Sequence, residues 1–172
     1  REQVNFLNVP PGSQLAALQG GSVDAIAAWE PFPTLILEKV PDAVLVSRGG
    51  RHIPYIINMS ALVDVIEKKP EVLERYVAAM AEASQYTRQH LDEAAEISTR
   101  WVPGLDLAVA KKSIRYMTFD PRITSLTIQA FEENAKILVE QKKLKAPMPW
   151  RQAMETKFID KVMKTHPQFF DQ

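Results

Sequence analysis

The first part of the chain alternates short apolar runs with polar breaks, a pattern that predicts strands. Residues Val4 to Val9 alternate apolar and polar side chains, as a half-buried strand does. Residues Val23 to Ala28 form a run of small apolar residues, which favours a strand buried on both faces. A third strand is expected over Ala43 to Ser47, after Pro41 ends the segment before it.

Two helices are expected between these strands. Ser13 can cap a short helix that ends at Gly20 and Gly21. Pro31 cannot continue the preceding strand, but it suits the first turn of a helix over Phe32 to Val40. The resulting order, β-α-β-α-β, predicts a small parallel sheet with crossover helices, and therefore an α/β fold.

From Ala61 onward the apolar residues recur at three- and four-residue spacing, so this part of the chain is predicted to be mostly helical. Ser47 to His52 separates the two regions with the composition of a loop or hinge. Asp92, Asp106 and Thr124 precede periodic segments and are expected to begin helices. The expected helices cover residues 61–69, 71–90, 93–102, 107–117, 124 or 125 to about 146, and 151–164.

Five residues of the first region are candidates for a ligand site, because ligands bind at the carboxyl ends of strands in parallel sheets. Trp29 and Glu30 follow one predicted strand, and Pro10, Gly12 and Ser13 follow another. The indole of Trp29 offers a flat apolar wall and one donor, and Glu30 offers an acceptor for an amine or hydroxyl. Backbone N–H groups at the helix start would favour an oxyanion such as sulfonate, nitrate or carboxylate.

Each candidate also has an ordinary structural explanation. Trp29 could be a core residue at the sheet edge, and Glu30 a carboxylate that suits the positive end of a helix dipole. The segment around Ser13 could be a common helix cap. Tyr55, which follows the predicted hinge and two nearby arginines, could reach into a cleft or lie in a strand beside a solvated loop.

Composition narrows the functional classes. The 21 basic and 21 acidic residues cancel, so the sequence predicts no attraction to nucleic acid or to a membrane surface. The absence of cysteine excludes disulfides, thiolate metal sites and cysteine nucleophiles from this chain. The three histidines lack ligand-spaced partners, and no phosphate-binding or nucleophile-elbow motif occurs, so neither a metal nor a cofactor is expected.

The pattern from Pro10 to Phe32 resembles the periplasmic substrate-binding proteins of ABC importers of the nitrate, sulfonate and taurine type, which include binders of thiamine precursors. An Ala-Leu pair and a Gly-x-Val-Asp-Ala segment lead to Trp-Glu-Pro-Phe. Residues 55–58 resemble the strand that returns from the second lobe to the first, and residues 69–83 the helix after it. The matching residues of the first segment are Pro10, Ala17, Leu18, Gly20, Val23, Asp24, Ala25, Trp29, Glu30, Pro31 and Phe32.

This resemblance implies a two-lobe, type II periplasmic-binding-protein fold without enzymatic activity. Residues 1–52 would be part of the second lobe, and residues 53–172 the return strand and helices of the first. The implied function is the solute-binding component of an ABC import system for a small anion such as a sulfonate or nitrate. The implied partners are that ligand and a membrane permease, and the implied location is periplasmic, or extracellular with a lipid anchor.

Other functions fit parts of the pattern. A pyrimidine-precursor binder, or a thiamine-pyrimidine synthase of the same fold, is one alternative, but the synthases carry a cysteine-rich motif and this chain has no cysteine. Effector domains of transcription regulators have a similar core, but the chain has no helix-turn-helix and ends in long helices. A helical interaction domain without a ligand is a further alternative.

The resemblance also predicts an incomplete fold. Family members have two lobes and are about twice as long, and this chain begins inside what would be the second lobe. We therefore expect it to be a C-terminal part of a longer protein. The helices from Glu71 onward carry apolar faces, and the predicted sheet has open edges, so we expect two copies to associate.

Overall fold

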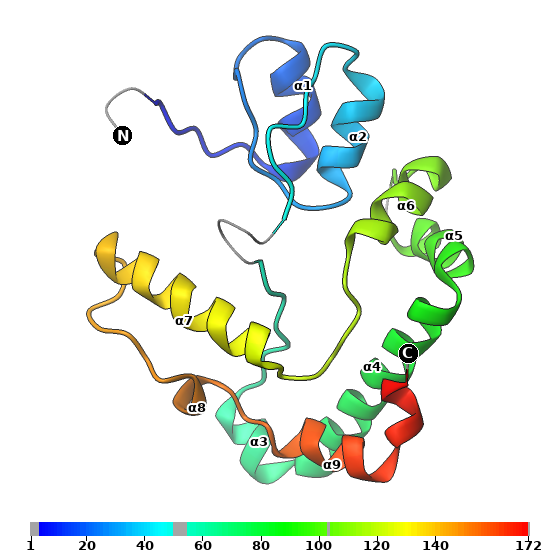
Figure 1. Ribbon diagram of the computed structural model, residues 1–172, viewed down its shortest axis with the longest axis vertical. Coiled ribbons are helices and arrows are strands. Elements are labelled where there is room, and N and C mark those ends of the chain that lie inside the picture. The colour runs from blue at the N-terminus through cyan, green and yellow to red at the C-terminus, as the bar shows by residue number, and fades with distance from the viewer. Residues whose placement is uncertain (1–3, 50–54, 103, 172) are drawn as a thin grey trace. The chain divides into compact units, whose positions relative to one another are not determined.

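The computed structural model describes residues 4–49, 55–102 and 104–171 (Figure 1). Contacts divide the chain into two units. The first comprises the described residues up to Val46 together with His90–Thr118, and the second comprises Ser47–Gln89 and the residues from Phe119 onward. Every regular element in the described ranges is helical. The predicted division into lobes at residue 52 stays a prediction, because these units are defined only by contacts within this chain.

The predicted parallel sheet, and with it the α/β class, is wrong for the described residues, which contain no strand. Residues 4–9, 23–28, 43–47 and 55–58 have no regular secondary structure. Their apolar side chains are largely exposed, and Phe6 is 81% and Val46 91% exposed. A strand of a parallel sheet must find hydrogen-bonding partners about a dozen or more residues away in sequence, whereas a helix closes its bonds within four residues. Alternating apolar residues therefore indicate that a segment is suited to a sheet, but they do not show that a second strand is present to pair with it.

The first unit is a group of short helices around a small core. Its α2 packs against α1 and α6, and α6 packs against α5. Ile36, Ala95, Val109 and Ile114 are among its buried apolar residues. Its elements are η1 (Pro11–Ser13), α1 (Gln14–Gln19), α2 (Phe32–Lys39), α5 (Leu91–Trp101), α6 (Leu107–Ser113) and η2 (Ile114–Tyr116).

Local signals explain where several of these helices begin and end. The Asp106 carboxylate accepts hydrogen bonds from the backbone N–H groups of Ala108 at 2.8 Å and Val109 at 3.2 Å, which confirms the predicted cap of α6. Gly21 has φ of 67° just after α1 and allows the backbone bond from Ser22 N–H to the Ala17 carbonyl. Ser13 precedes α1 as predicted, but its side chain makes no capping hydrogen bond.

The second unit is organised around the long helix α4, which packs against α9 and α3. Phe158, Ile159 and Val162 form the buried face of α9, and Ala81 is the buried residue of α4. Lys161 of α9 forms an ion pair with Glu74 of α4 at 2.6 Å. The elements of this unit are α3 (Val63–Lys68), α4 (Pro70–Gln89), α7 (Ser125–Glu140), α8 (Trp150–Ala153), α9 (Lys157–Thr165) and η3 (Pro167–Phe170).

One arginine joins three segments of the second unit. The Arg88 guanidinium, near the end of α4, donates to the carbonyls of Phe119 at 2.6 Å, Phe169 at 2.7 Å and Asp171 at 3.3 Å. Its neighbour on the same helix, Gln85, donates to the carbonyl of Gln168 at 2.6 Å. These side chains satisfy carbonyls of Phe119 and of the C-terminal segment, and hold η3 against α4.

Five of the six helices predicted for the second half are present, with shifted ends. Pro70 lies between the helices predicted over residues 61–69 and 71–90, and it occupies the first position of α4, where its missing N–H costs nothing. The single helix expected over residues 151–164 is wrong: α8 and α9 are separate. The break covers Met154 to Thr156, where the Glu155 carboxylate accepts from the backbone N–H of Lys157 at 3.1 Å and supports the start of α9.

The cap of α6 can be tested by substitution. Asp106→Ala leaves two N–H groups of the first turn without their acceptor, so we expect it to lower the free energy of unfolding by about 1 kcal/mol. Asp106→Asn should lose much less, because the amide oxygen still accepts. Urea unfolding followed by circular dichroism measures both. Asp24→Ala, an exposed loop position of the same unit, is the control, and equal stability of Asp106→Ala and this control would contradict the assignment.

Candidate functional site

Five of the six predicted site residues lie at or just before the starts of two neighbouring helices. Pro10 precedes η1, which holds Gly12 and Ser13 and leads directly into α1. Trp29 and Glu30 end the irregular segment before α2. The sheet edge that was expected to hold them is absent from the described residues, so helix starts take its place.

The two helices run side by side in the same direction, which brings their starts to one end of the pair (Figure 1). At the other end, the side-chain amide of Gln19, the last residue of α1, donates to the carbonyl of Lys39, the last residue of α2, at 3.3 Å. The paired helix starts are called the helix-start cluster below. It consists of Pro10, Gly12, Ser13, Gln14, Trp29, Glu30 and Thr34.

The helix-start cluster contains polar atoms that are removed from solvent. Both carboxylate oxygens of Glu30 are buried. The side-chain oxygens of Gln14 and Thr34 are buried as well, and among the described residues they have no hydrogen-bond partner. The amide nitrogen of Gln14 donates to the Val9 carbonyl at 3.4 Å. A buried polar atom without a partner costs about 1–3 kcal/mol, so such atoms are often found where a ligand supplies the missing bond.

Aromatic contacts orient Trp29 at the edge of this cluster. Its ring meets the Phe32 ring edge to face, with the ring centroids 6.1 Å apart and the planes at 89°. The Trp29 side chain is nevertheless 45% exposed, so part of the indole faces solvent. Gly12 and Ser13 are also exposed, and open space surrounds the position that a side chain on Gly12 would take.

Tyr55, the sixth predicted residue, belongs to the second unit and is 65% exposed. Its role as a ligand residue stays a prediction. The sequence analysis did not identify Gln14 and Thr34. Each is a polar residue on the buried side of a short helix. The sequence does not indicate which side is buried, because that depends on the packing of α1 on α2.

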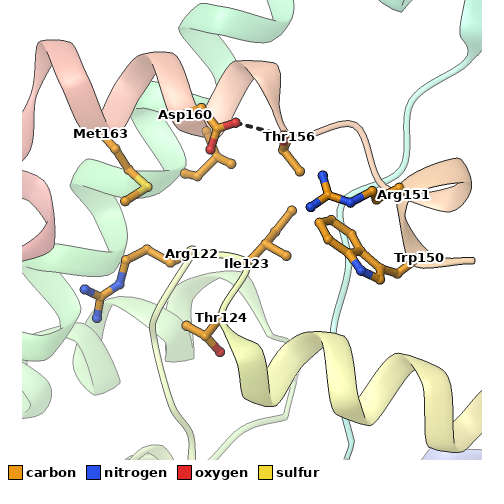
Figure 2. A pocket seen from close by; sticks show the side chains of 9 residues that line it. Arg122, Ile123, Thr124, Trp150, Arg151, Thr156, Asp160 and Met163 are labelled. Carbon is orange, nitrogen blue, oxygen red and sulfur yellow. Dashed lines mark hydrogen bonds between the residues drawn. The ribbon is translucent and has the colours of Figure 1, made fainter.

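A second polar site lies wholly within the second unit, where a cavity of about 500 Å³ opens between the start of α7, α8 and the start of α9 (Figure 2). Trp150, Arg151 and Arg122 are among its lining residues. The sequence analysis predicted none of these three as a site residue. Only the fold brings residues 122–124 to residues 150–163.

Arg122 is held beside this cavity by a carboxylate. Its Nε lies 2.8 and 3.0 Å from the two oxygens of Asp120, and its Nη2 lies 2.7 Å from Oδ2. These hydrogen bonds lower the pKa of Asp120, and the nearby charge of Arg88 lowers it further. The same pairing raises the pKa of Arg122. A two-armed guanidinium–carboxylate contact of this kind fixes the direction of the arginine as well as its charge.

Comparison with known proteins identifies the family. The model of the NMT1-like family matches residues 1–102, and the chain belongs to this family. It is 23% identical over 170 residues to a protein of Bacillus subtilis (strain 168) named "Putative aliphatic sulfonates-binding protein". This match covers 98% of the chain and 51% of the relative, so the chain spans about half of that protein's length. No solved structure matches the chain.

The described residues contain no group of three or more histidine, aspartate or glutamate residues placed to hold a metal ion. None of their helices combines the length and apolar character that a membrane span needs.

The Asp120–Arg122 pair predicts a loss of stability in acid. Because the pKa of Asp120 is lower in the folded chain than in the unfolded chain, the pair stabilises the fold above the unfolded value, about 3.9. This contribution is lost as the pH falls through the lower, folded value. We expect Asp120→Asn to cost about 1 kcal/mol at pH 7, after allowing for partial exposure of the pair.

Urea unfolding at pH 7, 5, 4 and 3 measures this difference. The gap between the original chain and Asp120→Asn should be constant down to pH 5 and shrink below about pH 4. Glu140→Gln, at an exposed position of α7, is the control for general loss of a carboxylate. A gap that does not change with pH would contradict the role of the ionised carboxylate.

Proposed function

We propose that this chain belongs to the solute-binding component of an ABC import system for a small anion, such as an aliphatic sulfonate. The observation that carries the proposal is similarity over 98% of the chain to a protein named for binding aliphatic sulfonates. Membership of the NMT1-like family supports the same class. The reaction is capture and release of a solute, with closure of lobes around it and no bond chemistry.

The helix-start cluster is proposed as this chain's contribution to the ligand site. The exposed part of the Trp29 indole would lie against the apolar carbon atoms of an organic anion. The Ser13 hydroxyl and the buried hydroxyl of Thr34 are the donors available to its oxygens. The backbone N–H of Ser13 is not available, because it already donates to the Pro10 carbonyl at 2.8 Å.

Glu30 places a limit on the ligand. Its buried carboxylate would repel a bare anion, and it lies just before α2, where the helix dipole stabilises negative charge. A ligand that also carries an N–H or O–H group could donate to this carboxylate or to the free oxygen of Gln14. The proposed ligands are therefore organic anions with such a group.

The partners and location follow from the proposed class. The bound solute would be delivered to an ABC permease in the membrane. The protein would work outside the cytoplasm, in the periplasm or held at the outer cell surface by a lipid anchor. Neither a metal nor a cofactor is needed for reversible binding of this kind.

Substitution of Trp29 tests the proposed site. In the full natural polypeptide, Trp29→Ala should weaken binding of 2-hydroxyethanesulfonate, an organic anion with an O–H group, about tenfold, since an aromatic wall contributes on the order of 1–3 kcal/mol. Isothermal titration calorimetry measures the dissociation constant. Trp101→Ala is the matched control, because Trp101 belongs to the same unit and is 80% exposed at the end of α5. Unchanged affinity in Trp29→Ala would remove this residue from the site.

We also propose that the chain associates with itself, as its exposed apolar residues require burial. Segments 4–7 and 44–46 each expose several large apolar side chains. Sedimentation velocity at several concentrations should show a rise in mass with concentration. A monomer at every concentration, without binding of a hydrophobic dye, would contradict this proposal.

A further inference from the structure

The cavity of the second unit combines an aromatic wall with an arginine that pairs with no carboxylate among the described residues. The Arg151 guanidinium lies over the Trp150 ring, with 4.5 Å between its central carbon and the ring centroid. Figure 2 shows the two side chains together at one side of the cavity. Among the described residues, Arg151 has no hydrogen bond and no ion pair. Stacking on the indole therefore holds the guanidinium in place without neutralising its charge.

The other charged groups at this cavity are already engaged. Arg122 is held by Asp120 through three hydrogen bonds. The Asp160 carboxylate accepts from the Thr156 hydroxyl at 2.8 Å, on the α9 side of the cavity (Figure 2). Among the described lining residues, Arg151 is thus the cation that pairs with no carboxylate. The Thr156 hydroxyl does not neutralise Asp160, so a bound acid would have to lie on the Arg151 side of the cavity.

The rest of the cavity is suited to an apolar chain. Ile123, Ile159 and Met163 line it beside Trp150. Its volume of about 500 Å³ lies within the range of roughly 300–1,000 Å³ that is usual for small-molecule sites. Such sites commonly combine apolar walls with a small number of placed polar groups.

We propose that this cavity binds an amphiphilic organic anion, meaning a sulfonate or carboxylate on a short apolar chain. The acid group pairs with Arg151 and the chain lies against Trp150, Ile123 and Met163. This site is separate in sequence from the helix-start cluster, which belongs to the first unit. It is therefore a second binding site, whose existence does not depend on the function proposed above.

Indole N–H signals report the two sites separately. The chain has three tryptophans, so a ¹⁵N-labelled sample gives three indole cross-peaks, and Trp150→Phe identifies that of Trp150. Titration with 1-hexanesulfonate should shift the Trp150 peak in a saturable way. The Trp29 peak reports binding at the helix-start cluster. Absence of binding at one site can therefore be distinguished from absence of binding at the other.

The charge requirement is tested with matched variants. Arg151→Gln should weaken the hexanesulfonate response of Trp150 about tenfold, while Arg75→Gln, an exposed position on α4 of the same unit, should leave it unchanged. Hexyl glucoside, which has the same chain and no charge, should bind at least tenfold more weakly. A Trp150 peak that does not shift would overturn the proposal. So would equal affinities of the two arginine variants, or of the two amphiphiles.

Discussion

The described part of this chain depends on one constraint, which is that its backbone hydrogen bonds close locally. Helices from four to twenty residues long satisfy their own N–H and C=O groups, and caps such as Asp106 and turns such as that at Gly21 satisfy the ends. Segments with strand-like sequences lack a pairing partner in the described residues and stay irregular. Their exposed apolar side chains follow directly from that lack.

The helices of the described residues bury few large apolar side chains against one another. Several buried residues are alanines, which let helices approach closely but bury little apolar area each: Ala81, Ala95, Ala110, Ala130 and Ala135. Larger buried side chains gather on α9, at Phe158, Ile159 and Val162. Side chain–backbone hydrogen bonds add to these contacts, chiefly those of Arg88, whose guanidinium donates to three carbonyls far away in sequence. Stability in the second unit therefore rests on both apolar burial and side chain–backbone hydrogen bonds.

Two kinds of polar group mark the candidate sites. At the helix-start cluster, buried oxygens of Gln14 and Thr34 lack partners within the described residues, so desolvation there is uncompensated by the protein. At the cavity of the second unit, Arg151 keeps its charge beside Trp150, whereas Arg122 is neutralised by Asp120. We propose a ligand with both donors and acceptors for the first site, and an acid with an apolar chain for the second.

The sequence by itself determined the features that depend on neighbouring residues. The helices of the second half, the cap at Asp106, the start of α7 after Thr124 and the family resemblance carried by residues 10–32 were all predictable, because capping and helical periodicity act within a few residues. The same short pattern predicted Trp29 and Glu30 as site residues, and their role in binding stays a prediction.

Tertiary structure alone decided what depends on partners far away in sequence. It left the strand-like segments unpaired, made Gln14 and Thr34 buried, and brought Arg122 to the cavity that Trp150 and Arg151 also line. Alternation of apolar and polar residues indicates that a segment can pair in a sheet. Pairing stabilises the strand only when a neighbouring strand is present.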